Sequence, residues 1–181
     1  MRYLTLLFIV VIVTTACKEP VKGKDGRVYK NAVDYNDYII SRQSLIMQDV
    51  IDFLKVSETN LDSSRKMLND YAVKIERMTE DIKGMPPYKG DSVLRDAAIH
   101  SFGFYKKIFQ NEYKQIIDIK LNGNDRTEEG VAELKHIVDK ITAEEEKYDK
   151  AFHNAQGDFA RKNNIKLAEN EMQKKLDKAT E

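Results

Sequence analysis

The chain has 181 residues, of which 33% are charged and 41% hydrophobic, and its 30 basic and 30 acidic residues give a formal net charge of zero. This composition is typical of a soluble globular protein. It argues against nucleic acid as a partner, because an excess of positive charge normally attracts the phosphate backbone. The single cysteine excludes an intramolecular disulfide. Only three prolines and little glycine favour helices over a turn-rich β fold.

The N-terminus resembles an export signal. Arg2 precedes an apolar run from Leu4 to Val13, which is shorter than the roughly 20 residues that a membrane-spanning helix needs. A positive start, a short apolar run and small residues at its end are typical of a secretory signal peptide. The sequence therefore predicts that residues 1–16 are removed on export.

The end of this segment, Thr14-Thr15-Ala16-Cys17, resembles the bacterial lipobox, in which small residues precede an invariant cysteine. The resemblance implies a diacylglycerol group on the Cys17 sulfur, cleavage after Ala16 and an acyl chain, such as palmitate, on the new N-terminus. The chain departs from the usual pattern at Thr14, where leucine is most common. An ordinary secreted protein with a free thiol is the alternative. Two or more acyl chains hold a protein stably on a membrane, whereas one gives only marginal binding.

The residues after the cysteine bear on location. Lys18 differs from the aspartate that retains many Gram-negative lipoproteins in the inner membrane, so we expect the outer membrane, with the periplasmic or surface face left open. Residues 17–29 are polar and contain Pro20, Gly23 and Gly26, which predicts a flexible tether. Because the chain has no net charge, we expect the lipid alone to hold it to the membrane.

Four amphipathic segments predict an all-α domain over residues 30–162. The segments are expected at about 31–57, 60–83, 91–121 and from Asp125 to Phe159. Only capping residues separate the first two segments, so a single bent helix is the alternative there. The prolines within residues 84–90 end the second segment, because proline cannot continue a helix. Asp91 is the expected N-cap of the third segment, and Asp125 with Glu128 suggests a capping box for the fourth.

The fourth segment has the most regular pattern. Its expected seam positions alternate in spacing between three and four residues: Val131, Leu134, Val138, Ile141, Glu145, Tyr148, Phe152, Ala155 and Phe159. Such spacing places side chains on one face of a helix. With short links between them, the four segments predict an up-down-up-down antiparallel four-helix bundle. A polar C-terminal extension is expected at residues 163–181.

Glu145 is the charged residue on this seam, and a buried carboxylate is costly unless it is paired or solvated. The first interpretation is a lysine or tyrosine partner, or a place near the end of the bundle, and Glu145→Leu should then stabilise the fold. The alternative is a polar pocket between the helices, formed by Glu145, Tyr148 and Phe104. Such a pocket would suit a carrier of a small ligand or a metal.

No motif predicts catalysis or a bound metal. Glu133 and His136 match the Glu-x-x-His element of a di-metal bundle once, but the predicted seam places both side chains on the outer face. Residues 118–129 fit a calcium loop only in part, since Lys120 stands where a ligand belongs, and a capped turn is the preferred interpretation. We therefore assign no catalytic residue, no metal ligand and no cofactor.

The loop between the second and third segments is a candidate contact element. Pro86, Pro87 and Tyr88 are expected at an exposed tip that presents an aromatic ring. A rigid interhelical turn is the alternative interpretation of the same residues.

Three stretches carry a resemblance to a known family. They are Tyr-Asn-Asp-Tyr-Ile at 35–39, then Gly90-Asp91 with Leu94–Ala98 and Phe104–Lys106, and Phe-Ala-Arg-Lys-Asn-Asn-Ile at 159–165. Together they resemble small helical surface lipoproteins, mostly uncharacterised, from spirochaetes and Bacteroidetes. The resemblance implies a lipid-anchored helical protein without catalytic residues. We expect a non-enzymatic envelope lipoprotein that binds a protein or another envelope component.

Overall fold

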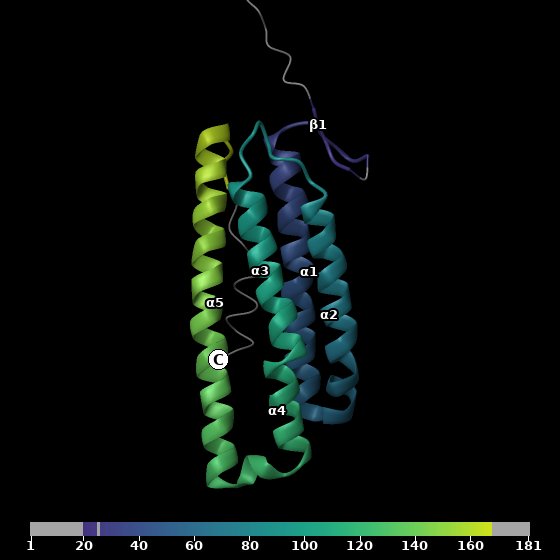
Figure 1. Ribbon diagram of the computed structural model, residues 1–181, viewed down its shortest axis with the longest axis vertical. Coiled ribbons are helices and arrows are strands. Elements are labelled where there is room, and N and C mark those ends of the chain that lie inside the picture. The colour runs from purple at the N-terminus through teal and green to yellow at the C-terminus, as the bar shows by residue number, and fades with distance from the viewer. Residues whose placement is uncertain (1–19, 25, 168–181) are drawn as a thin grey trace, which may run out of the picture.

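Four helical segments run alternately up and down the long axis of the molecule (Figure 1). The computed structural model describes residues 20–24 and 26–167. Its elements are β1 (Val21–Lys22), β2 (Val28–Tyr29), α1 (Ala32–Thr59), α2 (Leu61–Lys83), α3 (Val93–Gln110), α4 (Glu112–Leu121), the 3-10 helix η1 (Asn124–Arg126) and α5 (Glu128–Asn163). The predicted all-α bundle is confirmed, and α3 and α4 together form its third segment.

Polar caps set the ends of α1 and α2. The Asn31 side chain accepts the N–H of Asp34 at 2.9 Å, which starts α1. Asn60 has extended backbone at φ −151° and ends α1, and its side chain accepts the N–H of Ser63 at 2.9 Å. One residue therefore separates two distinct helices, and the alternative of a single bent helix across residues 57–60 is wrong.

The third segment is broken and begins later than expected. Asn111, at φ −121° and ψ −72°, separates α3 from α4, and its side-chain amide donates to the Lys107 carbonyl at 3.1 Å. At the other end, the Asp91 carboxylate accepts the N–H of Val93 at 2.9 Å, and α3 begins at Val93. Ser92, and not the expected Asp91, therefore directly precedes α3, although the Asp91 side chain accepts the first helical N–H.

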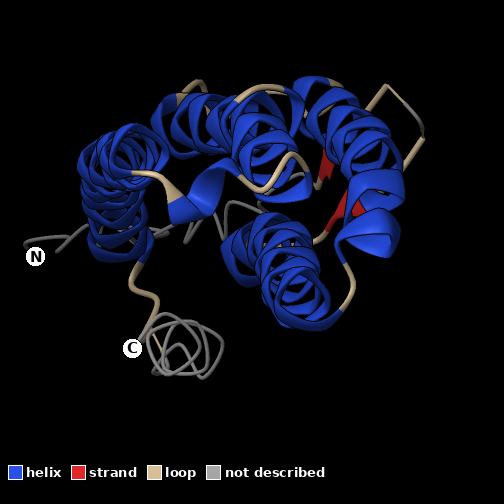
Figure 2. Ribbon diagram, turned by 90° about the horizontal axis from the view of Figure 1, so that it is seen from below, coloured by secondary structure: helices blue, strands red, loops and turns tan. Residues whose placement is uncertain are grey.

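The helix α3 lies at the centre of the bundle, where it packs against α1, α2 and α5; Figure 2 views the helices end-on. This central position accounts for the wide apolar stripe of the segment. Its buried apolar side chains are Leu94, Ala98, Phe102, Phe104, Tyr105, Ile108 and Phe109. Burial of each large side chain of this kind stabilises a fold by about 1.5–3 kcal/mol.

An aromatic cluster closes one end of the bundle. The Tyr35 ring is fully buried, and its centroid lies 5.3 Å from that of Tyr29, 5.2 Å from Tyr88 and 5.6 Å from Phe159. The Tyr35 hydroxyl donates to the Pro86 carbonyl at 2.9 Å. We call this the hairpin end, because β1 and β2 also lie here, and the opposite end, with η1, the turn end (Figure 1).

The strands β1 and β2 pair as a β-hairpin, so the prediction of a flexible tether over 17–29 is wrong for these residues. The antiparallel pairs are Val21 with Tyr29 and Lys22 with Val28. Tyr29 is buried against α1, and the Lys24 N–H donates to the Gly84 carbonyl at 3.1 Å. The polar composition of this stretch did not show that Tyr29 would pack against the rings of Tyr35 and Tyr38 or that Gly84, far along the chain, would accept a hydrogen bond from Lys24. Cys17 lies outside the described residues.

The first half of α5 departs from the predicted seam. Val131 and Val138 are 54% and 50% exposed, whereas Ile137, which the predicted seam leaves out, is 4% exposed. The later seam positions Phe152, Ala155 and Phe159 are buried as predicted. A straight helix repeats every 3.6 residues, so a strict alternation of three and four drifts by about 20° per heptad around the helix. One fixed seam therefore cannot face the core along all 36 residues of α5.

The start of α5 differs from the predicted capping box. Thr127 is the N-cap, and its hydroxyl accepts the N–H of Gly130 at 3.0 Å, while Asp125 lies in η1. Gly130 has no room for a side chain, since a Cβ atom there would lie 1.9 Å from the Asn124 carbonyl oxygen. The turn after α4 is thus built from close backbone contacts and a threonine cap, and the preferred interpretation of residues 118–129 as a capped turn is confirmed.

The helix α5 ends at Asn163, next to the predicted boundary of the bundle. Asn164 has a left-handed backbone at φ 54°, and the Ile165 N–H donates to the Ala160 carbonyl at 2.9 Å, a common way to end a helix. Most of the predicted extension at 163–181, like the predicted signal peptide, lies outside the described residues. Among the helices that the structure describes, none combines the length and the apolar character needed to cross a membrane.

Candidate functional site

A surface groove of about 560 Å³ lies between α3 and α5, near the hairpin end. It exists because the facing positions carry small side chains, Ala97 on α3 and Ala151 and Ala155 on α5. Val93, which is 52% exposed, and the half-buried Tyr148 add apolar surface to its lining. The groove is therefore an open, mainly apolar depression on the surface of the bundle.

Polar and charged side chains surround this groove: Asp96, His100, Lys147, Asn154 and Asp158. Asp96 accepts hydrogen bonds from the Ser92 hydroxyl at 2.6 Å and from Arg95 at 2.9 Å. Desolvation opposes its ionisation, but these hydrogen bonds together with the charges of Arg95 and His100 outweigh it, so the pKa of Asp96 lies below its ordinary value. Asp158 is paired with Arg161. Because both carboxylates already have cationic partners, the groove suits an apolar side chain better than a charged ligand.

The residues predicted to form an interhelical pocket, Glu145, Tyr148 and Phe104, do lie together where α3 meets α5. The rings of Phe104 and Tyr148 stack with centroids 5.1 Å apart and 23° between their planes, and Phe104 is 3% exposed. Stacked rings fill the space between two helices and leave no room for a ligand there. The hollow opens outward beside Tyr148 instead of inward beside Glu145.

Glu145 has the tyrosine partner that the first interpretation expects. Tyr105 is fully buried, and its hydroxyl donates to the Glu145 carboxylate at 3.0 Å. Burial, and after it the Glu145 charge, raise the pKa of Tyr105 well above its ordinary value, so the hydroxyl keeps its proton. The sequence did not single out Tyr105 as a partner, because it is one of many aromatic residues on the apolar stripe of α3.

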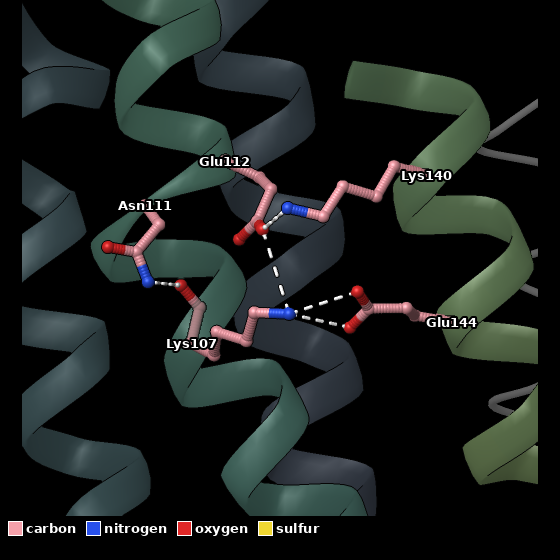
Figure 3. A network of polar contacts seen from close by, with 5 residues as sticks. All are labelled: Lys107, Asn111, Glu112, Lys140 and Glu144. Atoms are coloured by element: carbon pink, nitrogen blue, oxygen red, sulfur yellow. Dashed lines mark hydrogen bonds and ion pairs between the residues drawn. The ribbon is translucent and has the colours of Figure 1, made fainter. Parts of the chain in front are cut away.

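A second polar contact between α3 and α5 lies at the break before α4 (Figure 3). The Lys107 ammonium lies 2.7 and 3.0 Å from the two Glu144 carboxylate oxygens and 3.8 Å from Glu112. Lys140 donates to Glu112 at 2.8 Å. The hydrogen bond from Lys107 holds the pKa of Glu144 below its ordinary value. Two cations and two anions thus join α3, α4 and α5 in a neutral network.

We interpret this network as structural, because its charges are matched. Glu112 is buried, with 3% of the residue exposed. One of its carboxylate oxygens has no hydrogen-bond partner among the described residues. The network was not predicted from the sequence, because its residues come from three separate helices. The spacing of four between Lys140 and Glu144 is the one signal that the sequence offers.

The predicted contact loop is corrected by the structure. Tyr88, expected at an exposed tip, is 4% exposed, and its ring lies 5.2 Å from Tyr35 and 5.4 Å from Phe159. Pro86 is half-buried and Pro87 is exposed. The sequence could not show this, because the rings that cover Tyr88 come from the first and last helices. The loop is the rigid interhelical turn that the alternative interpretation expects.

The sequence motifs considered for metals occupy ordinary positions. Glu133 and His136 are both exposed on α5, as the predicted outer face requires. Asp118 lies within α4 and forms ion pairs with Lys114 at 3.0 Å and Arg65 at 3.3 Å. Within residues 20–24 and 26–167, no group of three or more histidine, aspartate or glutamate side chains is placed to hold a metal ion.

Comparisons of the chain with protein-family models, with curated proteins and with solved structures found no match.

Proposed function

We propose that the protein is a non-enzymatic, lipid-anchored component of the cell envelope that binds a protein partner through the groove between α3 and α5. The anchor is Cys17, and the outer membrane is the expected location. The resemblance to small helical surface lipoproteins points to the same class of protein. The proposal assigns no catalytic residue and no cofactor.

The sequence around Cys17 supports the anchor. A positive start, an apolar run and Thr-Thr-Ala directly before the cysteine are what a lipoprotein precursor requires. The folded domain begins at Val21, shortly after this point. Cys17→Ser should therefore move the protein from the membrane fraction to the soluble fraction, and a variant that stays with the membrane would contradict the anchor.

The groove is the observation that carries partner binding. It combines an apolar lining, a rim of polar and charged side chains and the exposed side chain of Val93, features that protein interfaces share at their core and rim. Its volume would accept one or two apolar side chains of a partner segment. The alternative, a carrier with a small ligand between the helices, has less support, because Phe104, Tyr105 and Tyr148 occupy that space.

A photo-crosslinking residue in the groove would test this proposal in intact cells. Placed at Ala151, it should give one major cross-linked envelope protein. Placed at Ala132, which is exposed on α5 outside the groove, it should not give that product. Filling the groove with Ala97→Trp should abolish the cross-link from position 151.

A folding control and a second substitution show whether loss of the cross-link reflects the groove itself. The thermal unfolding of Ala97→Trp should match that of the parent, and if it does not, Val93→Lys provides a surface substitution in the same groove. Equal products from positions 151 and 132, or a product that survives both substitutions, would contradict a binding role for the groove.

A further inference from the structure

The zero net charge of the chain conceals a separation of charge between the two ends of the bundle. Residues 20–30, which include the hairpin, carry four basic residues and one acidic residue, a net charge of +3. Residues 124–134, at the turn end, carry four acidic residues and one basic residue, a net charge of −3. Figure 1 shows that these segments lie at opposite ends of the molecule.

Most acidic groups from the other elements at the hairpin end are paired with cations outside the hairpin. The pairs are Asp91 with Lys162, Asp158 with Arg161, Asp96 with Arg95, Glu80 with Lys83 and Asp81 with Arg42. Asp34 and Asp37, in the first turns of α1, have no ion pair of this kind within the described residues, and the Asp34 carboxylate accepts the Lys30 backbone N–H at 3.2 Å. The ammonium groups of Lys22, Lys24 and Lys30 form no ion pair with any residue that the structure describes. These three lysines are all exposed, so they present positive charge that no ion pair within the described residues neutralises.

The backbone that carries these cations is attached to the bundle. The hairpin is bound through the buried Tyr29 and through the hydrogen bond from Lys24 to the Gly84 carbonyl. The Arg27 guanidinium lies 4.5 Å from the centre of the Tyr38 ring. Val28, beside it, is 46% exposed. The hairpin thus offers a basic surface with one apolar side chain on a segment that packs against the bundle.

The length of chain before the hairpin limits where this surface can be. Val21 follows Cys17 by four residues, which span at most about 14 Å when fully extended. A lipid on Cys17 would place the hairpin within reach of the headgroups. The Debye length at physiological ionic strength is about 8 Å, so cations this near to an anionic surface interact with it.

We propose that the hairpin end faces the membrane and that Lys22, Lys24 and Lys30 bind the phosphate groups of anionic phospholipids. This inference rests on the lipid anchor proposed above. The lipid holds the protein on the membrane, and the separated charge orients it. The 36 residues of α5 span about 54 Å, so the acidic turn end stands far from the surface that would repel it.

The orientation can be measured on the full lipidated protein in vesicles with a quencher attached to the lipid headgroups. Acylation consumes the only natural thiol, so an introduced cysteine becomes the only labelling site. A fluorophore at Val28→Cys should be quenched in vesicles of phosphatidylcholine mixed with phosphatidylglycerol, and less in phosphatidylcholine alone. A fluorophore at Glu129→Cys, at the turn end, should stay unquenched in both.

Two triple variants that remove the same charge show whether the effect comes from the hairpin lysines or from the net charge of the protein. The substitutions Lys22→Gln, Lys24→Gln and Lys30→Gln should lower the ratio of docked to undocked protein about fivefold for each cation removed. The substitutions Lys55→Gln, Lys66→Gln and Arg126→Gln remove the same charge from exposed positions toward the turn end and should leave the quenching at position 28 unchanged. Equal quenching at positions 28 and 129, or equal effects of the two triple variants, would overturn the proposed orientation.

A failure of the anchor would look different from a failure of the orientation. Without acylation, Cys17 would react with the label as well, and the protein would carry two fluorophores and would not enter the vesicles. With acylation confirmed by a single fluorophore, loss of the contrast between positions 28 and 129 counts against the hairpin surface alone.

Discussion

The two ends of the bundle are built in different ways. At the hairpin end, the cluster around Tyr35 joins side chains from the hairpin, α1, the loop after α2 and the last turns of α5. At the turn end, the chain reverses through local contacts, with Thr127 capping Gly130 and Gly130 pressed against Asn124. One end therefore depends on contacts between distant parts of the chain, and the other depends on backbone geometry within a few residues.

This difference shows where stability and function are expected to lie. The long-range cluster fixes the hairpin, and with it the cations that we assign to the membrane. It also fixes the end of α5, which forms one wall of the groove. The local turn determines only where α5 begins. Substitutions at the two ends should therefore differ in size and in kind.

The largest effect is expected in the aromatic cluster. Phe159 is 3% exposed and contacts both Tyr35 and Tyr88, so Phe159→Ala should lower the free energy of unfolding by about 3–5 kcal/mol. Denaturant unfolding would measure the change. Val138→Ala on the same helix is the control, because Val138 is half exposed, and it should change stability by less than about 0.5 kcal/mol. Similar losses for both variants would contradict the distinction between core and surface on α5.

A backbone substitution tests the turn end. Gly130→Ala should lower stability by about 1–3 kcal/mol, because its Cβ atom would collide with the Asn124 carbonyl and the turn must shift. Gly157→Ala, also within α5, has open space around the new Cβ atom and should raise stability by about 0.4–1 kcal/mol. Thermal unfolding of the two variants would show opposite shifts. A shift in the same direction would refute the local account of the turn.

The contact between Tyr105 and Glu145 lies between the two ends. Tyr105→Phe removes one hydrogen bond and should cost about 1 kcal/mol. Glu145→Leu leaves the buried hydroxyl without this acceptor, so it should destabilise the protein by about 1–3 kcal/mol, contrary to the stabilisation expected from sequence. In the double variant, the loss should be smaller than the sum of the two single losses. Additive losses would show that this hydrogen bond couples the residues weakly.

The smallest effect is a dependence on pH at the hairpin end. The hydrogen bond from Lys162, and then that from the Val93 N–H, lower the pKa of Asp91 below its ordinary value. The folded state therefore binds a proton at Asp91 less readily than the unfolded state does. The stabilisation that the ionised Asp91 contributes is fully present above the ordinary pKa of aspartate. It is lost as the pH falls through the lower pKa of the folded state. Asp91→Asn should reduce the loss of stability in that acidic range. Adding Lys162→Met to Asp91→Asn should change the profile little further, and a large additional change would mean that Lys162 acts through another group.

The sequence predicted the number and order of the helical segments, but it missed several helix ends and the contacts between distant parts of the chain. The amphipathic segments and the helix-ending prolines predicted four helical segments in the correct order, whereas the capping box expected at Asp125 was wrong because Thr127 caps α5. The predicted seam of α5 failed at Val131 and Val138, because the pitch of a long helix shifts one pattern away from the core. The exposed position expected for Tyr88 failed because its covering rings are far along the chain.

The candidate site was also predicted only in part, because the sequence shows which residues share a face of one helix but not how two helices pack. Glu145, Tyr148 and Phe104 do meet, since helical periodicity places them on facing sides of α5 and α3. That the rings fill the interior, and that a groove opens beside them, depends on the small side chains of Ala97, Ala151 and Ala155 facing one another. No pattern within one helix shows which small residues will face each other across an interface.

We propose that Cys17 carries the lipid that places the hairpin end at the membrane. The intact mass of the protein purified from membranes tests this claim most directly. We predict a chain that begins at residue 17 and carries a diacylglycerol group and an additional acyl chain. A mass that corresponds to the full 181 residues, or to a shorter chain with a free Cys17 thiol, would contradict the account.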